Sequence, residues 1–264
     1  MKKPFSLALW WGAARWIAHI GVIRKFEELW VVPIAISGTS MWAVVWALYA
    51  LWKSASEMEQ IAKDIPFLRL METWGNLGLF KWNNVEAYLD ELFWGKYFED
   101  TKIPFSTTAT DIDTGEGIVF PTGKLSEAVR ASISLPGIFY PKEIDERSLV
   151  DGGLTNNLPV ELLPEGKVIA VSALRDIKRK IPKVIEVFWI EWKRSIFWNT
   201  YDIIQKTTDI MLTQNENRSI ESREEVLYVR PEFDTLDYYN FLEYKMFIEA
   251  GYAASGEIID FLED

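Results

Sequence analysis

Residues 29–52, LWVVPIAISGTSMWAVVWALYALW, form a 24-residue stretch without a charged side chain. By length alone such a stretch could cross a lipid bilayer. Its interior favours another fold, because Pro33 and the polar turn 37–40 divide it into a short β-rich piece, 34–36, and a helix-length piece, 41–51. A strand, a tight polar turn and a helix are typical of a parallel-sheet unit, whose strands are apolar on both faces. We therefore expect a buried α/β unit here, with a strand that ends at Ser37 and a helix from about Ser40, and not a transmembrane helix.

The same pattern continues on both sides of this stretch. Residues 5–9 predict a first strand, and a small-residue turn leads into an apolar-periodic helix that ends near Leu29. The resulting β-α-β-α order is typical of a mostly parallel sheet with helices on its faces. Further strands are predicted at 105–112, 117–120, 149–150 and 168–171, and helices at 54–100, 124–132, 196–217 and 243–263. We expect one α/β domain over residues 1–264, with a helical C-terminal part at 196–264.

Composition excludes several classes of protein. The 264 residues are 49 % hydrophobic and 25 % charged, a balance that excludes a disordered or collagen-like chain. The absence of Cys excludes disulfides and cysteine-ligated metals, and the single histidine, His19, excludes a histidine-rich metal site. A net charge of −11 argues against a nucleic-acid partner, because the phosphate backbone would be repelled.

The N-terminus imitates a secretion signal, with Lys2 and Lys3 before an apolar run. No convincing cleavage site follows, so we expect a cytoplasmic protein, with peripheral membrane contact as an alternative. A basic cluster could touch anionic lipid headgroups, although a solvated charged face is the commoner explanation of such clusters. Its members are Arg175, Lys178, Arg179, Lys180 and Lys183.

Residues 38–42, GTSMW, lie between a predicted strand and a predicted helix. A nucleophile elbow belongs at such a junction, where a sharp turn exposes a serine hydroxyl at the N-terminus of the following helix. Ser40 is the candidate nucleophile, and Gly38 and Trp42 flank it at the elbow positions. The alternative is that Ser40 only caps the helix.

A serine nucleophile needs a base, and no histidine follows Ser40 in the sequence. His19 lies among apolar residues and is interpreted as a packed core histidine. The base must then be a carboxylate that acts directly on the serine. Asp151 is the best candidate, because it follows a predicted strand end and the dyad loop residues Gly152 and Gly153 allow a close backbone approach. The alternative is an ordinary turn aspartate.

Acyl transfer also requires donors for the oxyanion. The turn after the first strand offers backbone N–H groups and a helix N-terminus, and by topology it lies beside the Ser40 turn. The candidate oxyanion hole consists of Trp11, Gly12, Ala13 and Arg15.

Three segments together resemble bacterial patatin-like phospholipases. They are residues 7–22 (LALWWGAARWIAHIGV), 38–41 (GTSM) and 151–159 (DGGLTNNLP). Residues 109–116, 128–132 and 135–139 add to the likeness, which runs from about residue 5 to 165, whereas the last hundred residues add little. The resemblance implies a three-layer α/β/α sandwich and a lipid acyl hydrolase with a Ser–Asp dyad.

Carried onto this chain, the resemblance makes Ser40 the nucleophile, Asp151 the base and residues 10–13 the oxyanion loop. It implies a lipid or other acyl-ester substrate, and it requires no metal and no cofactor. Two alternatives stay open. The chain could be a catalytically dead patatin-like relative that binds lipid or serves as a scaffold, or a membrane-anchored protein that uses the uncharged stretch.

The chain departs from the resemblance at seven tryptophans, where the family would have glycine: Trp10, Trp11, Trp16, Trp30, Trp42, Trp46 and Trp52. Glycine at such places allows positive φ and close helix–strand contact, which an indole forbids. We hypothesise that UGA codons for glycine are read here as tryptophan, and Trp82 and Trp94 fit the same idea. The alternative is an interfacial tryptophan belt for membrane docking. Whether the literal chain is active is left open.

Overall fold

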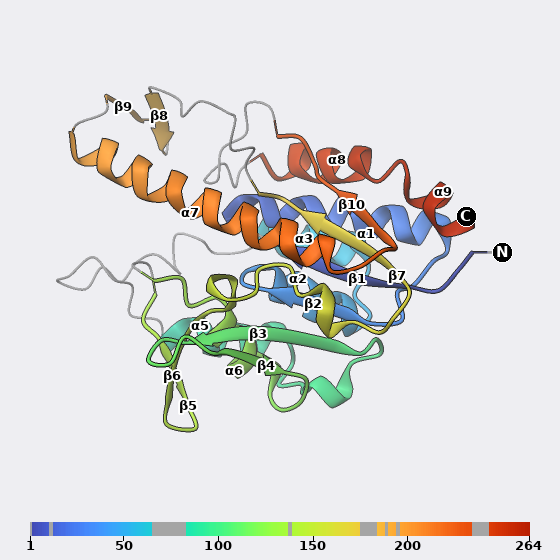
Figure 1. Cartoon of the computed structure of the whole chain (residues 1–264), viewed down its shortest axis with the longest axis horizontal. Coiled ribbons are helices and arrows are strands. Elements are labelled where there is room, and N and C mark those ends of the chain that lie inside the picture. Colours follow the sequence, from blue (N-terminus) through green and yellow to red (C-terminus); the bar gives the residue numbers. More distant parts are fainter. Residues whose placement is uncertain are drawn as a thin grey trace.

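The computed structural model describes residues 2–10, 13–64, 83–136, 139–174, 184–187, 190–193, 196–233 and 243–264. Within these ranges the central sheet has the strand order β10-β7-β1-β2-β3-β6-β5, and β4 pairs with β3 outside this path (Figure 1). Its strands are β1 (Phe5–Trp10), β2 (Ile36–Thr39), β3 (Phe105–Asp111), β4 (Gly117–Phe120), β5 (Lys142–Ile144), β6 (Arg147–Asp151), β7 (Lys167–Ser172) and β10 (Val226–Val229). A separate antiparallel pair consists of β8 (Val184–Val187) and β9 (Ile190–Lys193).

The sheet is parallel from β10 through β7, β1 and β2 to β3, and antiparallel beyond it. The carboxyl ends of the parallel strands point to the left in Figure 1. The helices are α1 (Ala18–Leu29), α2 (Trp42–Ala50), α3 (Ala55–Asp64), α5 (Asn83–Leu92), α6 (Leu125–Ser132), α7 (Ile196–Glu221), α8 (Tyr244–Ala254) and α9 (Ile258–Glu263). The predicted α/β class with a mostly parallel central sheet is confirmed.

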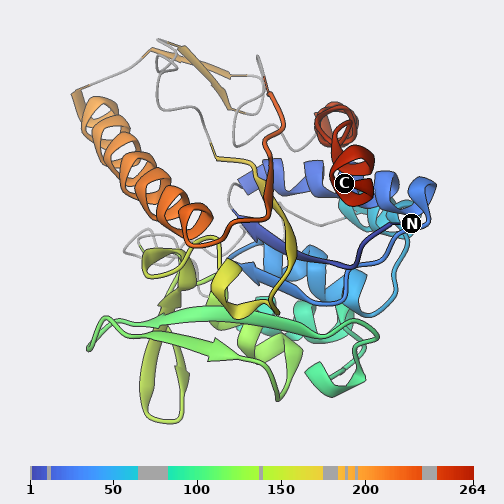
Figure 2. The same ribbon diagram turned by 45° about the vertical axis from the view of Figure 1, so that its right-hand side comes forward.

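Helices cover both faces of the sheet, which makes three layers. In β1, Leu7 and Leu9 belong to the core beneath α1, α2, α3, α5, α6 and α8, whereas Ala8 belongs to the core on the other face, where Leu212 of α7 packs. Strand β7 alternates in the same way. Figure 2 shows the central strands between α7 and the α1–α8 pair. Burial on both faces explains why the strands read as nearly continuous apolar runs.

The uncharged stretch 29–52 folds as a strand, a turn and a helix, as the sequence predicts. The strand ends two residues beyond the predicted end at Ser37. Strand β2 spans Ile36–Thr39, because residues 36–39 join the parallel ladder with β3. The chain reversal therefore falls at Ser40, at the very end of the polar segment. Among the described residues, no helix combines the length and the apolar character needed to span a bilayer.

Helices α1 and α8 cross in close contact, at Gly21 and Gly251. A methyl group on Gly251 would overlap the carbonyl of Ala18, and one on Gly21 would overlap the carbonyl of Ile248. The clashing partners are backbone atoms, which cannot turn aside as a flexible side chain can. Two glycines thus fix the distance at which α8 packs on α1.

We predict that Gly251→Ala lowers the free energy of unfolding by about 1–3 kcal/mol, because the added methyl forces α8 away from α1. Chemical denaturation of the purified variant measures this change. The control is Gly256→Ala, where the nearest atom to the new methyl, the Ala253 carbonyl oxygen, is 3.8 Å away. That variant should stay within about 0.5 kcal/mol of the parent. Equal effects of the two substitutions would contradict the close crossing.

Candidate active site

Ser40 occupies the turn between β2 and α2, with a left-handed backbone (φ 64°). A left-handed conformation strains a residue that carries a side chain, and it persists only where surrounding contacts hold it. Here it turns the Ser40 hydroxyl away from the ladder at the carboxyl edge of the sheet. Gly38 lies in β2 and Trp42 is the first residue of α2, so Ser40 lies between a strand and a helix.

Two strands point at each other along one edge of β3 and bring Ser40 and Asp151 together. Strand β2 pairs with β3 in parallel up to Thr108, and β6 pairs in antiparallel fashion with Ala109 and beyond. Strand β4 pairs with Thr107–Thr110 and so takes the opposite edge of β3. Strands β2 and β6 therefore lie end to end, and Ser40 and Asp151 meet where the two strands end.

The contact between the two side chains is direct. Ser40 Oγ donates a hydrogen bond to Asp151 Oδ2 at 2.5 Å, with no imidazole between them. The other carboxylate oxygen of Asp151 accepts the N–H of Gly153 at 2.8 Å. Gly152 lies so close to β3 that a methyl group there would overlap the carbonyl of Thr108. The dyad loop therefore needs glycine at 152 for close approach, and it uses the N–H of 153 to orient the carboxylate.

Burial sets the acidity of Asp151, which is only 1 % exposed. Desolvation raises the pKa of the Asp151 carboxyl to about 7, and the hydrogen bonds from Ser40 and Gly153 oppose that rise. A carboxyl with such a pKa is partly ionised near neutral pH and is a much stronger base than an exposed aspartate.

Helix α6 holds the backbone on both sides of this contact. At its last residue, Ser132 Oγ accepts the N–H of Ser40 at 2.8 Å. Thr107 Oγ1 lies 3.0 Å from Ser132 Oγ and donates to the Gly38 carbonyl at 2.7 Å. These hydrogen bonds connect the strained turn to β3 and to α6, and they account for its left-handed backbone.

The same helix reaches Asp151 through a second pair of residues. Arg130 Nη1 donates to Ser134 Oγ at 2.6 Å, and the Ser134 carbonyl accepts the N–H of Asp151 at 3.0 Å. Arg130 is buried, and its Nη2 also donates to the Tyr140 carbonyl. Residues 128–132 belong to the segments that resemble the patatin-like family, but the sequence alone predicted no role for Arg130 or Ser132. The family motif was the one sign that these residues matter.

The candidate oxyanion hole is described only in part. Trp11 and Gly12 lie outside the described residues, and Ala13 begins a 3₁₀ turn that precedes α1. Because Leu9 pairs with Gly38, this turn leaves the sheet at the same edge as Ser40. The guanidinium of Arg15 is buried 4.6 Å from the centre of the Phe233 ring, and it donates to the Ala173 carbonyl at 3.4 Å.

His19 is fully buried, as the sequence predicts, and its ring lies against that of Trp42, with 3.8 Å between ring centres and a tilt of 31°. Desolvation keeps the pKa of the His19 imidazole well below its usual value, so the ring is neutral. Neither ring nitrogen has a hydrogen-bond partner. His19 is therefore a core residue in this structure.

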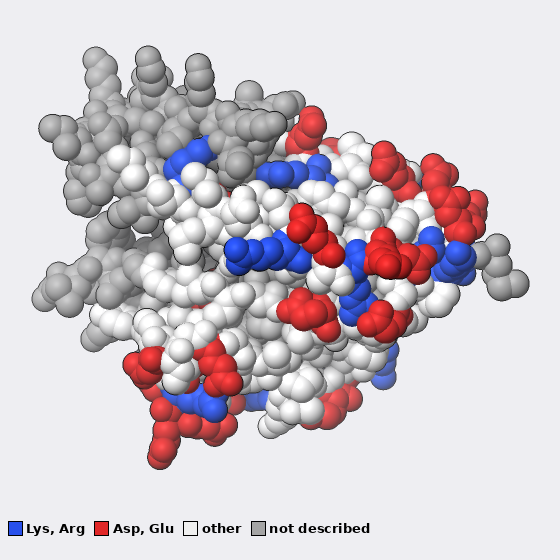
Figure 3. Space-filling model, in the orientation of Figure 1, with Lys and Arg blue, Asp and Glu red and all other residues white. Residues whose placement is uncertain are grey.

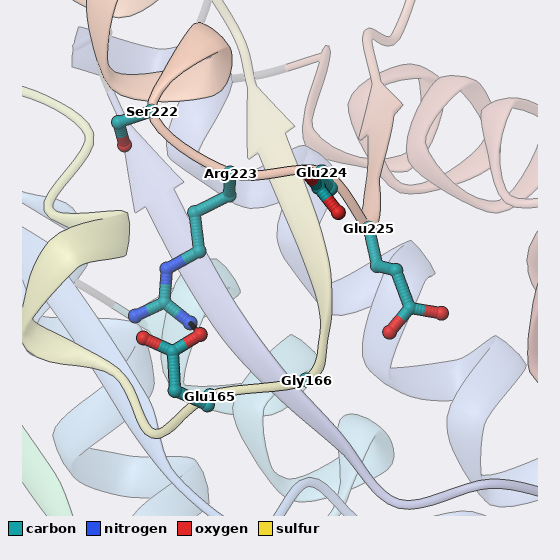
Figure 4. Close-up of a pocket in the computed structure, with 6 residues that line it drawn as sticks. All are labelled: Glu165, Gly166, Ser222, Arg223, Glu224 and Glu225. Atoms are coloured by element: carbon teal, nitrogen blue, oxygen red, sulfur yellow. Dashed lines mark ion pairs between the residues drawn. The ribbon is translucent and has the colours of Figure 1, made fainter.

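A hollow of about 230 Å³ lies at the opposite edge of the sheet, where β7 and β10 begin (Figure 4). It contains Arg223, which donates to the carbonyls of Leu163 and Pro164 and pairs with Glu165. These contacts tie two loops together, far from the carboxyl edge where Ser40 lies.

Charge and metal-binding groups add no second site to the described part of the chain. On the face drawn in Figure 3, its acidic and basic side chains intermingle. No cluster of three or more metal-ligating His, Asp or Glu side chains occurs within the described ranges. The basic cluster 175–183 lies outside them.

We predict that Asp151→Asn makes the protein more stable than the parent at pH 8 and not at pH 4. Folding raises the pKa of Asp151 from 3.8 to about 7, so the parent loses stability as pH rises through this window. Each pKa unit corresponds to about 1.4 kcal/mol, so the gap between the two proteins should open by up to about 4 kcal/mol. Urea unfolding at a series of pH values measures it. A gap that does not change with pH would contradict the buried, raised carboxyl.

A sequence model of the family described as patatin-like phospholipase matches residues 12–164. An uncharacterized NTE family protein of Mycobacterium tuberculosis is 35 % identical over 159 residues, which are 59 % of this chain and 44 % of that protein. Patatin-like phospholipase domain-containing protein 6 of Homo sapiens is 28 % identical over 273 residues, 95 % of this chain and 20 % of that protein. The chain thus spans less than half the length of these curated relatives.

Two solved structures share the fold over the whole chain. VipD from Legionella pneumophila superimposes with a TM-score of 0.63 at 10 % identity and covers 99 % of this chain and 67 % of its own. ExoU in its heterodimeric complex with SpcU, from the type III secretion system of Pseudomonas aeruginosa, gives 0.56 at 14 % identity, over 100 % of this chain and 53 % of its own. At such identities the likeness shows the fold alone.

Proposed function

Because this chain belongs to the patatin-like phospholipase family, we propose that it is a serine acyl hydrolase that cleaves fatty-acyl esters of lipids. The observation that carries the proposal is the direct 2.5 Å hydrogen bond from Ser40 to Asp151. A serine hydroxyl on a strained turn, bonded to a buried carboxylate of raised pKa, is a nucleophile paired with its base.

In the proposed reaction, Ser40 Oγ attacks the ester carbonyl carbon while its proton passes to Asp151 Oδ2. The tetrahedral intermediate collapses, the C–O bond to the alcohol breaks, and Asp151 returns the proton to the departing alkoxide. Water then attacks the acyl-enzyme and gives its proton to Asp151, and Ser40 leaves with that proton as the fatty acid is released. The pKa of about 7 suits Asp151 to both accept and return a proton near neutral pH.

The backbone N–H groups of residues 11–13 are proposed to stabilise the oxyanion, since the carboxyl end of β1, which precedes them, lies at the same sheet edge as Ser40. Arg15 is proposed as a positioning residue, because its buried guanidinium holds this turn against Ala173 and Phe233. Peripheral contact with a lipid surface would supply the substrate, and this too is part of the proposal.

We predict that a fluorophosphonate probe labels Ser40, because the probe reacts with activated serines and mimics the tetrahedral intermediate. Peptide mapping identifies the modified residue. Ser40→Ala should abolish both labelling and hydrolysis of a p-nitrophenyl ester. The labelling rate of the parent should rise with pH through an apparent pKa near 7, because the proton acceptor must be ionised.

Other outcomes point elsewhere. Labelling at another serine, or unchanged ester hydrolysis by Ser40→Ala, would overturn the assignment of the nucleophile. Binding of acyl chains by the folded protein without labelling or turnover would favour the alternative of a catalytically dead lipid-binding relative.

We predict that Ser132→Ala lowers kcat about tenfold or more and leaves KM nearly unchanged, because Ser132 is fully buried and holds the Ser40 backbone. Ser132→Thr, which keeps the hydroxyl, should recover much of the rate. The control is Ser126→Ala in the same helix, whose hydroxyl bonds Asp90 instead. Equal losses in the Ser126 and Ser132 variants would indicate a general effect on α6 and contradict the positioning role.

A further inference from the structure

Three helices end on a tryptophan with a left-handed backbone. Trp30 follows α1 with φ 53°, Trp52 follows α2 with φ 72°, and Trp94 follows α5 with φ 53°. For a bulky side chain such a φ is a genuine outlier, because the Cβ atom crowds the neighbouring carbonyl.

The hydrogen bonds around each of these residues are those of one helix-ending motif. The N–H of Trp30 donates to the Glu27 carbonyl, and the next N–H, that of Val31, reaches back to Phe26. The other two ends repeat the pattern: Trp52 to Tyr49 with Lys53 to Leu48, and Trp94 to Glu91 with Gly95 to Asp90. This is the Schellman motif, whose left-handed position is usually occupied by glycine.

Every other left-handed residue in the described ranges that carries a side chain has a local explanation. Ser40 is the elbow, where α6 and β3 hold the turn. Asp145 and Glu146 are the two central residues of the tight hairpin between β5 and β6, where positive φ at both positions is the rule. The three tryptophans instead occupy the left-handed position of a Schellman motif, where glycine is the usual residue.

A second set of tryptophans is buried and has unsatisfied donors. Trp16 is 4 % exposed, and Trp42 and Trp46 are fully buried on one face of α2. None of their three indole N–H groups has a hydrogen-bond partner. His19 packs against Trp42 and Trp46, and both of its ring nitrogens lack partners as well. Buried polar groups in folded proteins are nearly always paired, so this cluster is foreign to a well-packed core.

We infer that the protein made by its own organism carries glycine at these six positions, encoded by UGA codons that are read there as glycine. One residue type then explains two independent anomalies, because glycine adopts the left-handed conformation without strain and adds no buried donor. Trp10 and Trp11 fall under the same inference by their place in the sequence, although the Trp10 side chain and all of Trp11 lie outside the described part.

A membrane-docking belt does not account for these tryptophans. Trp16, Trp42 and Trp46 are in the core and cannot reach lipid. Trp30 and Trp52 are exposed at helix ends that return to the amino edge of the sheet, and Trp94 joins them there, since the Lys53 ammonium lies 4.5 Å from its ring centre. That edge is opposite to Ser40, so docking by it would turn the nucleophile away from the bilayer.

The first test compares Trp30→Gly, Trp52→Gly and Trp94→Gly with the matching Trp→Ala variants. Both substitutions remove the indole, and only glycine removes the Cβ from the left-handed position. Each Trp→Gly variant should have a melting temperature about 2–4 °C above that of its Trp→Ala partner. A left-handed backbone costs a residue with a Cβ about 1 kcal/mol, and in a protein of this size that free energy corresponds to such a shift. Equal melting temperatures at all three positions would overturn the inference for the exposed set.

The second test addresses the buried set. Truncation of a tryptophan that belongs to a well-packed core strongly destabilises the protein. We expect instead that the triple variant with Trp16→Gly, Trp42→Gly and Trp46→Gly has a higher melting temperature than the chain with tryptophan at these positions. A large loss of stability would overturn the inference for these positions.

The gene and the native protein give the direct answer. UGA codons at these positions, with glycine in tryptic peptides of the protein isolated from its organism, are the expected result. UGG codons, or peptides that contain tryptophan, would overturn the inference. The outcome is separable from the proposed reaction: a glycine form that is more stable yet unlabelled by fluorophosphonate would uphold the inference and refute the hydrolase.

Discussion

The hydrogen bond from Ser40 to Asp151 is the constraint on which the rest of the described site depends. It requires a serine with a left-handed backbone and a buried carboxylate. Each of these features, taken alone, destabilises the folded state. Hydrogen bonds to the backbone on both sides of the pair offset this cost. Ser132 holds the amide of Ser40, and the amide of Gly153 and the carbonyl of Ser134 hold the two ends of Asp151.

Helix α6 gives the site its rigidity. Through Ser132 it fixes the turn that carries Ser40, and through Arg130 and Ser134 it fixes the strand that ends in Asp151. One short helix thus sets the relative position of two groups that approach from opposite directions along β3. Such indirect support is what keeps a hydrogen-bonded pair within the narrow geometry that proton transfer demands.

Much of this could be predicted from the sequence, because the relevant signals are local. The uncharged stretch, interrupted by the polar residues 37–40, predicts the strand-turn-helix unit. The lack of any histidine after Ser40 indicates a carboxylate as the base, and Asp151 was the best candidate. The bounds of β2 were wrong by two residues, since glycine and threonine suggest a turn while the ladder with β3 keeps residues 38 and 39 extended. The roles of Ser132 and Arg130 arise from contacts with residues far away in the chain. No periodicity or composition signal reports such contacts.

The end-to-end arrangement of β2 and β6 also has a consequence for synthesis of the protein. Ser40 and its acceptor are 111 residues apart, and strand β3, against which both align, is made between them. When only the residues up to β4 have been synthesised, Ser40 is present but Asp151 is not. On the proposed mechanism, the hydroxyl is therefore unreactive toward an ester until the hairpin of β5 and β6 pairs with β3 and places Asp151 beside it.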